Sequence, residues 1–439
     1  MCGIFAIFSS QKKKDIGYNI LNGLRLLQHR GKDGYGIAFY IDNNFYIIKK
    51  TGKIKIDDLN IAPCQCCIGH NRYATSGKTI KNGIVKENEL QPLKGEIDGK
   101  EYYLVHNGNI PYVQGHDTRY IINLINSLIG LSMEERLIYI INKIPAAYCL
   151  VLLFDNKLYI IRDKYGIRPL CIGCQRDCYY ISSESYGLGN IPFLKDVLPG
   201  EILRIDENGL QSIYIHPNNK EAALCTFEIL YFLNENSIVD GYNIKNIRQQ
   251  LAIKLASKER NIDKKCIVIG IPLTGIILGK AYAKYLDLEY KQWIVKNAGL
   301  GRTFIIKTDK ERKEACLKKF NYHSVDLIGK KIIIVDDTIV RGNIIRAIIQ
   351  NLRNIGVKEV HVRIPAPPVI DKCYLGISIQ DKCELIKTGR TIDEICKVIK
   401  ADTLKYLTLN DIGEFMPKES YNHCFSGYID KEINISKMI

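Results

Sequence analysis

The sequence lacks the features that would place the protein in a membrane or outside the cell. No apolar run in its 439 residues approaches the roughly 20 residues that span a bilayer. The chain does not open with a basic leader and a small-residue cleavage site, and it contains no internal repeat or low-complexity tract. We therefore expect a cytoplasmic protein. Its fifteen cysteines are then thiols, metal ligands or a nucleophile rather than a disulfide framework.

Blocks of like charge are also missing, although the net charge is +15. A basic balance favours anionic partners, but it does not choose between nucleic acid, a membrane surface and phosphorylated metabolites. The nearest approach to a block, Lys12-Lys13-Lys14, is typical of a solvated turn. Because the positive charge is scattered and no DNA-binding motif is present, we expect neither a nucleic-acid partner nor a membrane partner.

The pattern of strands and helices changes near residue 220. Before this point short β-type runs dominate, and helical stretches at residues 15–28 and 119–143 interrupt them, which indicates an α+β fold. After it strands and helices alternate, which predicts an α/β fold with a mostly parallel sheet. We place the two domains at residues 1–220 and 221–439, with a C-terminal extension in the second.

Cys2 follows the initiator Met1 and precedes Gly3. Removal of Met1 would leave Cys2 with a thiol and a free α-amine, whose reference pKa of about 8 suits it to act as base to the thiol. The thiolate is the attacking form of a cysteine. Cys2 is thus a candidate nucleophile, and the alternative is a buried cysteine in a terminal strand.

Three downstream segments carry polar groups of the kind that acyl transfer from glutamine needs. The Asn107 amide and the Gly108 N–H are suited to an oxyanion. Arg72 is suited to a carboxylate, and Asp117 is the nearest acid downstream of the oxyanion segment. The alternatives are ordinary ion pairs for Arg30 and Arg72, a plain turn at Asn107 and Gly108, and a helix N-cap at Asp117. The segments are residues 28–34, 69–75 and 106–109.

The runs Met-Cys-Gly-Ile, Gln-His-Arg-Gly, Gly-His-Asn-Arg-Tyr-Ala-Thr and His-Asn-Gly-Asn occur in this order. Together they resemble the class II glutamine amidotransferase domain, over roughly residues 1–215. The resemblance implies an N-terminal-nucleophile hydrolase fold, an αββα sandwich, with Cys2 as the nucleophile. It also implies a glutamine pocket lined by Arg30, Arg72, Thr75, Asn107, Gly108 and Asp117. The sequence departs from the family at residues 32–35 and in the short interval before Asp117.

A second strong signal is the apolar run at residues 331–335, which leads into Asp336 and Asp337. A strand of this kind delivers its carboxylates to the edge at which doubly wound sheets bind ligands. The next turn offers backbone N–H groups and the Thr338 hydroxyl to a phosphate, and the carboxylates suit ribose hydroxyls or indirectly held Mg2+. The alternative is an acidic strand end followed by an ordinary turn.

This run resembles the phosphoribosyl pyrophosphate (PRPP) binding loop of type I phosphoribosyltransferases. Its surroundings, over about residues 222–427, are similar to the amidophosphoribosyltransferase family. The resemblance implies that Asp336 and Asp337 hold the ribose and Mg2+, and that a catalytic loop with Lys296, Asn297 and Arg302 closes over PRPP. It implies that the 5′-phosphate is held by Thr338, Ile339, Val340, Arg341, Gly342 and Asn343. The departures from the family pattern include Leu273, Ala298 and Ile344.

The resemblance implies that ammonia released from glutamine displaces pyrophosphate from PRPP, giving 5-phosphoribosylamine and glutamate, the first step of de novo purine synthesis. It also implies inhibition by purine nucleotides and a homo-oligomer, either a dimer or a tetramer. Two alternatives stay open. The chain is a diverged paralogue that senses PRPP as a binding or regulatory protein, or it is a glutaminase with a different acceptor.

Some members of the family carry a 4Fe-4S iron–sulfur cluster on four cysteines, and such clusters need thiolate ligands. By the resemblance, Cys225, Cys373 and Cys424 stand at three of those places, whereas Tyr421 stands at the fourth. Three thiolates without a fourth make an incomplete set of ligands. We therefore expect no stable cluster.

Overall fold

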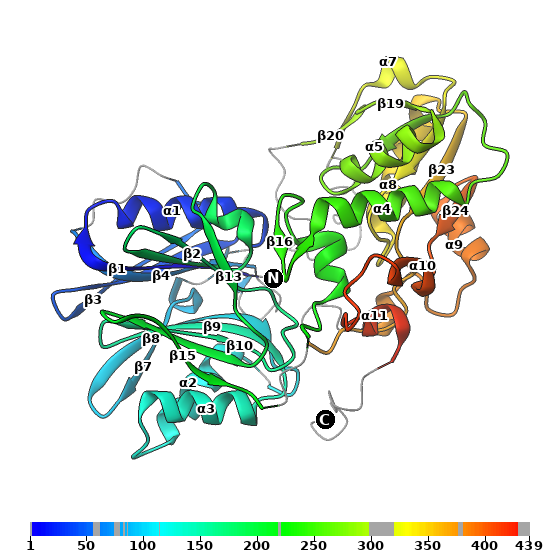
Figure 1. Cartoon of the computed structure of the whole chain (residues 1–439). Helices are drawn as coiled ribbons and strands as arrows, with labels where there is room; N and C mark the ends of the chain where they lie inside the picture. The colour runs from blue at the N-terminus through cyan, green and yellow to red at the C-terminus, as the bar shows by residue number, and fades with distance from the viewer. Residues whose placement is uncertain are drawn as a thin grey trace.

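The structure is a computed structural model that describes residues 2–55, 62–73, 80–81, 84–85, 87–113, 115–217, 221–297, 320–375 and 381–428. It consists of two parts that lie side by side (Figure 1). We call residues 2–217 the N-terminal half and residues 221–428 the C-terminal half. No helix among the described residues has the length and apolarity needed to cross a membrane.

The N-terminal half is built on two large antiparallel sheets. The strands of the first are β1 (Gly3–Lys13), β2 (Gly34–Ile41), β3 (Asn44–Thr51), β4 (Cys64–Arg72), β11 (Cys171–Gln175), β12 (Cys178–Ser182) and β13 (Phe193–Asp196). Those of the second are β7 (Leu93–Ile97), β8 (Lys100–Asn109), β9 (Ala147–Phe154), β10 (Lys157–Arg162), β14 (Glu201–Asp206) and β15 (Gly209–Ile215). Their orders are β13-β11-β12-β1-β4-β2-β3 and β15-β14-β10-β9-β8-β7.

Strand alternation explains how the layers are built. Phe5 and Ile7 of β1 pack with helix α1 (Ile16–Leu26), whereas Ile4 and Ala6 face the second sheet. Successive strand residues point to opposite faces, so a strand buried on both sides reads as a continuous apolar run. Helices α2 (Asp117–Ser127) and α3 (Met133–Lys143) cover the outer face of the second sheet. The αββα sandwich is thereby confirmed.

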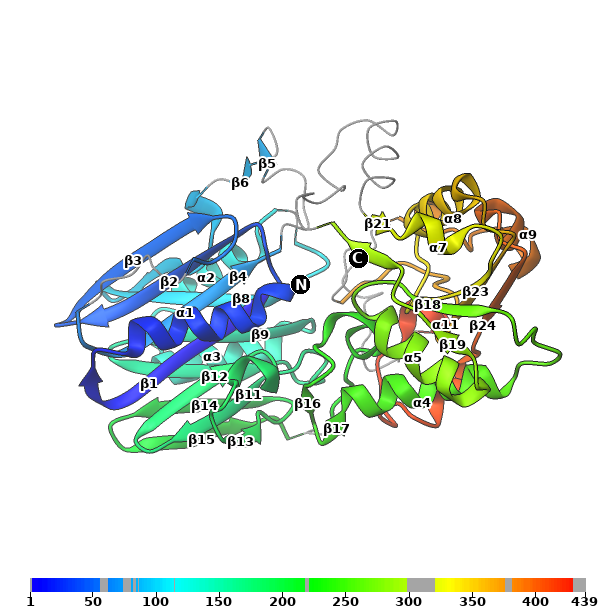
Figure 2. The ribbon, with the colours of Figure 1, turned by 90° about the horizontal axis from the view of Figure 1, so that it is seen from above.

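The C-terminal half contains a five-stranded parallel sheet in the order β19-β18-β22-β23-β24. Figure 2 shows its strands lying between helices α4 and α5 on one side and α8 and α9 on the other. This confirms the predicted α/β fold. The strands are β18 (Ile267–Gly270), β19 (Glu289–Tyr290), β22 (Lys331–Val335), β23 (Glu359–Ile364) and β24 (Thr403–Tyr406), and the helices are α4 (Ile244–Ser257), α5 (Gly275–Leu286), α8 (Asn343–Ile355) and α9 (Ile392–Ile399).

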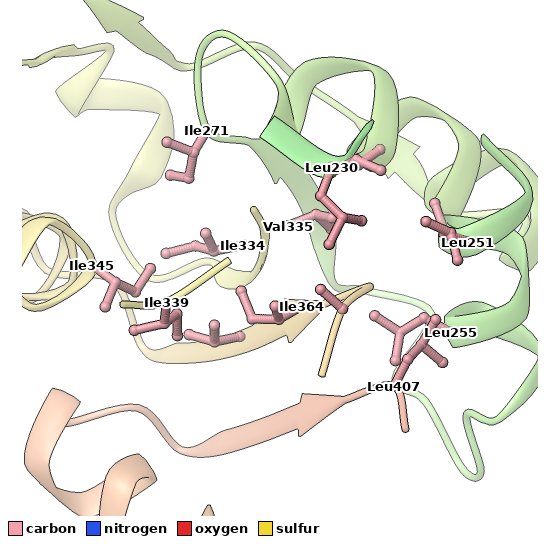
Figure 3. Packing of buried hydrophobic residues seen from close by; sticks show 14 of the residues in the cluster. Leu230, Leu251, Leu255, Ile271, Ile334, Val335, Ile339, Ile345, Ile364 and Leu407 are labelled. Carbon is pink, nitrogen blue, oxygen red and sulfur yellow. The ribbon is translucent and has the colours of Figure 1, made fainter. Parts of the chain in front are cut away.

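One apolar core holds this half together. Leu251 and Leu255 of α4 face Val335 of β22 and Ile364 of β23 in the interior (Figure 3). The short elements around it are η6 (Glu228–Phe232), β16 (Ile238–Val239), β17 (Tyr242–Asn243), β20 (Ile294–Lys296), β21 (Phe320–Tyr322), α7 (Ser324–Leu327), η8 (Lys382–Glu384), α10 (Leu409–Gly413) and α11 (His423–Ser426). Those of the N-terminal half are η1 (Leu27–His29), β5 (Ile80–Lys81), β6 (Ile84–Val85), η4 (Glu87–Glu89) and η5 (Ser185–Leu188).

Buried charges join the two halves. Both terminal nitrogens of Arg162, on β10, donate to the carboxylate of Asp240, each at 2.7 Å. The Asp240 N–H donates in turn to Asp196 Oδ2 at 2.9 Å. The predicted domain boundary near residue 220 falls between β15 and η6. It stays a prediction.

The carboxyl group of Asp196 should make stability depend on pH. Burial, and then the Asp240 carboxylate, raise the pKa of Asp196 to about 7 against the opposing effect of Arg162. The pKa of an aspartate in the unfolded chain is about 3.9. The native state therefore loses stability as the pH rises from about 4 to about 7. The Asp196→Asn variant has no carboxyl group at this position, so it does not lose stability in this way. Its free energy of unfolding relative to wild type should rise by about 1–4 kcal/mol between pH 4 and pH 7.

Urea unfolding of both proteins across this pH range measures the difference. Asp177→Asn is the control, because a hydrogen bond from Lys13 lowers the pKa of the exposed Asp177 carboxyl. That variant should show no such rise. A difference between Asp196→Asn and wild type that is independent of pH would contradict the assignment.

Candidate functional site

Cys2 stands immediately before β1, the central strand of the first sheet. It is half-buried, and its backbone N–H donates to Asn107 Oδ1 at 3.1 Å. Asn107 is a buried residue of β8 in the second sheet. Its Nδ2 atom is buried and has no hydrogen-bond partner in the described part of the chain. The structure thus brings the predicted nucleophile and the predicted oxyanion donor together.

Gly108 lies at a point of close approach between β8 and β9. A Cβ atom there would lie 2.4 Å from the Ala147 carbonyl oxygen and 2.6 Å from His106 Nε2. Both distances are far below van der Waals contact, so only glycine fits this position. Residue 108 therefore adds no side chain next to the Asn107 amide.

Further buried polar atoms around Cys2 and Asn107 have no partner among the described residues. Buried polar groups in native proteins are nearly always hydrogen-bonded, so such a group of atoms indicates a site for a polar ligand. Burial, and then the neighbouring Arg72 and His106 side chains, hold the pKa of His70 well below its usual range, so its ring is neutral. The atoms are Arg72 Nε, His106 Nε2, His116 Nδ1 and both ring nitrogens of His70.

Arg72 and Asp117 carry opposite charges near these atoms. Arg72 ends β4, is 8% exposed, and donates through Nη1 to the Glu89 carbonyl at 3.0 Å. Asp117 is the first residue of α2, and His116 is its N-cap, so the N-cap alternative is wrong. Burial alone would raise the pKa of Asp117, but His106, His116 and the Thr118 N–H lower it on balance. Asp117 is therefore ionised. Thr75 lies outside the described residues.

The structure places Arg30, a predicted member of this pocket, against the backbone of Cys2. Its side chain is fully buried, and its Nε donates to the Cys2 carbonyl at 3.0 Å. Its two terminal nitrogens pair with Glu184 and Glu228. These contacts hold the guanidinium against the Cys2 carbonyl and two carboxylates, and its role in the glutamine pocket stays a prediction. No local pattern points to the two carboxylates, which stand 154 and 198 positions away along the chain.

The second candidate site lies at the carboxyl end of β22. Asp337 is 5% exposed, and its carboxylate accepts hydrogen bonds from Thr338 Oγ1 at 2.7 Å and from Thr274 Oγ1. Burial raises the pKa of Asp337 against these hydrogen bonds. A Cβ atom on Gly275 would lie 2.5 Å from the Val335 carbonyl, so the turn before α5 packs tightly on β22. The predicted carboxylates thus reach the sheet edge as expected.

The loop after Asp337 buries Ile339 and ends at a glycine in the left-handed conformation. Ile339 is 4% exposed and points into the core beside Ile345 (Figure 3). Gly342 has a φ of +77° and caps α8, which starts at Asn343. The loop therefore leads directly to a helix N-terminus, the arrangement that binds anions.

A segment that the sequence analysis missed lies against this loop. The Ile386 N–H donates to the Val340 carbonyl at 2.9 Å, and Arg341 pairs with Glu384 at the surface. No local pattern marks this contact, because the two segments are distant in sequence.

The predicted catalytic loop starts at the end of β20, where this stretch of described residues stops. Lys296 is exposed at the end of β20, and Asn297 is half-buried beside it. Arg302 lies outside the described residues. The roles of these three residues stay predictions.

The residues at the end of β22 fit a magnesium ion. Mg2+ prefers oxygen ligands and is commonly bound through one or two carboxylates together with substrate phosphates. Asp336 and Asp337 supply oxygen ligands next to the proposed phosphate loop. No group of three or more His, Cys, Asp or Glu in the described ranges could hold a metal ion by protein side chains alone.

The residues at the predicted iron–sulfur position do not fit a cluster. Cys225 forms a parallel β-bridge with Tyr421, and the Tyr421 side chain is buried with an unpaired hydroxyl in the described part of the chain. Burial, and then the thiols of Cys373, Cys225 and Cys424, raise the pKa of Tyr421. A neutral phenol thus occupies the place of the fourth thiolate. Burial and Cys373 raise the pKa of Cys225 itself to about 12.

Comparison with known proteins assigns the family. Residues 239–366 match the model of the phosphoribosyl transferase domain. The amidophosphoribosyltransferase of Methanocaldococcus jannaschii is 32% identical, over 100% of this chain and 99% of that protein. That of Pyrococcus horikoshii is 33% identical, over 92% of this chain and 91% of that protein. The solved structure of glutamine PRPP amidotransferase from Bacillus subtilis, in complex with ADP and GMP, is also similar. It superposes with a TM-score of 0.86 at 27% identity, over 98% of this chain and 97% of that chain. This chain therefore belongs to the amidophosphoribosyltransferase family.

Proposed function

We propose that this chain hydrolyses glutamine at Cys2 and transfers the ammonia to PRPP, which yields 5-phosphoribosylamine, glutamate and pyrophosphate, the first step of de novo purine synthesis. The observation that carries the proposal is the presence of both sites in one chain that matches the family over its whole length. One site has a cysteine beside an unpaired buried amide. The other has two carboxylates and a phosphate-type loop at a sheet edge.

The proposed glutaminase chemistry starts with removal of Met1, which frees the Cys2 amine. Asn107 Oδ1 orients that amine, since it already accepts the Cys2 N–H at 3.1 Å. The Cys2 thiolate attacks the side-chain carbonyl carbon of glutamine, and Asn107 Nδ2 and the Gly108 N–H stabilise the oxyanion. The tetrahedral intermediate collapses with loss of ammonia. Water then cleaves the thioester to release glutamate and regenerate the thiol.

We assign recognition of the glutamine backbone to charges of opposite sign. Arg72 holds the α-carboxylate, because its Nε is buried and unpaired in the described part of the chain. Asp117, ionised and half-exposed at the start of α2, holds the α-ammonium. Thr75 remains a predicted member of this pocket.

In the C-terminal half the Asp336 and Asp337 carboxylates accept hydrogen bonds from the ribose hydroxyls. The 5′-phosphate lies on the turn from Thr338 to Asn343, where backbone N–H groups and a helix N-terminus face it. The ammonia lone pair attacks C1 of the ribose, and pyrophosphate leaves with the electrons of the broken C–O bond. Mg2+, when bound beside Asp336 and Asp337, neutralises charge on the pyrophosphate. The predicted loop of Lys296, Asn297 and Arg302 would exclude water from this step.

We extend the proposal to partners and place in the cell. The related structure from Bacillus subtilis is named as a complex with ADP and GMP, which supports purine nucleotides as inhibitors of this chain. Family kinship supports a homo-oligomeric, cytoplasmic enzyme. The incomplete set of thiolates supports an enzyme without an iron–sulfur cluster.

Cys2→Ala should separate the two reactions. Glutamine-dependent pyrophosphate release should fall by about a thousandfold or more, because no thiolate remains to form the acyl intermediate. Release with added ammonium should stay within about twofold of wild type, because the second site is intact. A pyrophosphate assay with PRPP and Mg2+ measures both activities. Cys174→Ala, at a half-buried thiol of β11, is the matched control.

Two results would contradict the two-site reaction. Loss of ammonium-dependent release in folded Cys2→Ala would mean that the sites are not separable. Absence of release from wild type with either nitrogen source, alongside intact glutaminase activity, would show that the C-terminal half has left PRPP chemistry. The paralogue with another acceptor or a sensing role would then take its place.

Arg72→Lys should weaken glutamine binding selectively. A lysine cannot form the bidentate pair with a carboxylate, so the KM for glutamine should rise by roughly tenfold to a hundredfold. The rate with ammonium should not change. Steady-state kinetics with each nitrogen source provide the measurement. Arg204→Lys, at an arginine of β14 that pairs with Glu134, should leave both unchanged. An unaltered KM for glutamine in Arg72→Lys would remove Arg72 from the pocket.

Tyr421→Cys should create a cluster site that wild type lacks. The substitution supplies a fourth thiolate beside Cys225, Cys373 and Cys424, so anaerobic reconstitution should load about four iron atoms per chain. Wild type treated in the same way should retain almost no iron or sulfide. Tyr428→Cys, which adds a cysteine at an exposed tyrosine, should behave as wild type does. Wild type that purifies anaerobically with a full cluster would refute the assignment.

A further inference from the structure

Two buried carboxylates, those of Glu184 and Glu228, link the backbone of Cys2 to the C-terminal half. Glu184 follows β12, and Glu228 is the first residue of η6. Both side chains are 0% exposed, so they form their contacts without competition from water. The chemistry at Cys2 described above uses neither group directly.

Side chains hold the backbone of Cys2, because the strand that follows begins only at Gly3. Asn107 accepts the Cys2 N–H on one side, and Arg30 Nε donates to the Cys2 carbonyl at 3.0 Å on the other. The position of the Arg30 guanidinium therefore sets the position of the Cys2 carbonyl. The Cys2 side chain, which carries the thiol, leaves the backbone at the Cα atom between these two anchored groups.

Carboxylates from both halves fix the Arg30 guanidinium. Nη1 donates to Glu184 Oε1 at 2.9 Å, and Nη2 donates to Glu228 Oε1 and Oε2 at 3.1 and 3.3 Å. Arg168, which is 1% exposed, donates to the same Glu228 Oε1 at 2.9 Å. A guanidinium with planar donors bound on two edges has a single orientation.

The C-terminal half also holds Glu184. The Asn234 N–H and the Ser237 hydroxyl each donate to Glu184 Oε2 at 2.7 Å. His29 Nε2 lies 2.6 Å from Glu184 Oε1. Residues 228–237 of the C-terminal half thus supply one carboxylate of the network and orient the other.

Two carboxylates, those of Glu184 and Glu228, face the guanidinium groups of Arg30 and Arg168. Burial raises the pKa of Glu184, but His29 and Arg30 hold it well below its usual range. Removing one partner of a buried ion pair leaves the other charge uncompensated. Loss of the Glu228 charge would leave Nη2 of Arg30 and Nη1 of Arg168 without their carboxylate partner.

We propose that Glu228 is a positioning residue of the glutaminase centre: it orients Arg30 and through it fixes the Cys2 carbonyl, so that the thiol points at the bound glutamine. This inference rests on the proposed role of Cys2 as nucleophile. It makes glutamine hydrolysis dependent on residues 228–237, at the beginning of the half that consumes the ammonia.

Glu228→Gln tests the proposal. Glutamine keeps the shape and one acceptor oxygen but removes the charge that orients Arg30. The kcat for glutamine hydrolysis should fall by about tenfold or more, while the KM for glutamine stays within about twofold because Arg72 is untouched. Pyrophosphate release with ammonium should also stay within about twofold. Glu201→Gln is the matched control, since Glu201 is 1% exposed, pairs with Lys195 and lies outside this network.

Glu228→Gln that hydrolyses glutamine as fast as Glu201→Gln does would overturn the proposal. So would an equal fall of both activities at an unchanged thermal midpoint, because the effect would then not be specific to Cys2. If Glu228→Gln does not fold, Glu228→Asp replaces it, since this variant keeps the charge but withdraws it from Arg30 by one methylene. A lower kcat with glutamine alone supports the proposal, and an unchanged kcat refutes it.

The proposed function can fail separately. Cys2→Ala that still hydrolyses glutamine would remove Cys2 as the nucleophile, whatever Glu228→Gln shows. If Cys2→Ala does not hydrolyse glutamine and Glu228→Gln hydrolyses it at the full rate, Cys2 remains the nucleophile and only the positioning role of Glu228 is rejected.

Discussion

The burial of the Arg30 guanidinium between Glu184 and Glu228 is the constraint on which the arrangement of this protein depends. A charged group away from water is costly unless it is paired and hydrogen-bonded. Here the compensating carboxylates come from different parts of the chain, one from the N-terminal half and one from the start of the C-terminal half. The halves must therefore dock in one way for the network to be satisfied. Arg162 and Asp240 add a second buried pair across the same junction.

The N-terminal half provides a rigid support for this network. Its two sheets bury apolar residues on both faces, and Cys2 and Asn107 project from facing sheets at one end of the sandwich. Close packing explains why glycine stands at position 108, where any side chain would strike the Ala147 carbonyl. Among the described residues, Asn107 Nδ2, Arg72 Nε and His106 Nε2 are buried without hydrogen-bond partners on the strands at this end, which is the arrangement expected of a site that a polar substrate completes.

Two of the predicted departures from the family pattern, Leu273 and Ile344, lie in the C-terminal half. Ile344 is partly buried against the core, so an apolar side chain at the start of α8 contributes to packing. Nothing in the structure explains Leu273, which is 62% exposed beside the end of β18. Asp337 and its two threonine hydroxyls nonetheless form an ordered edge to the sheet, and the parallel order of strands is that of a ligand-binding α/β domain.

The amino-acid sequence by itself determined both fold classes and the places of Cys2, Asn107, Asp336 and Asp337, because these follow from local signals. Strand and helix periodicity, a strand end and a tight glycine turn are all written within a few neighbouring residues. The resemblance to the amidotransferase domain placed Arg30 in the glutamine pocket, and that role stays a prediction, although its contacts are with the Cys2 carbonyl, Glu184 and Glu228.

Only the tertiary structure decided the contacts of Arg30, since its partners Glu184 and Glu228 are remote in sequence and ion pairs leave no periodic pattern. It likewise decided that Tyr421 meets Cys225 and Cys424, and that residues 384–386 lie against the phosphate loop. The roles of individual site residues remain predictions, most plainly for Thr75 and Arg302 outside the described ranges. Pairing between distant segments is fixed by packing and by the need to compensate buried charge, and neither can be read from a single stretch of chain.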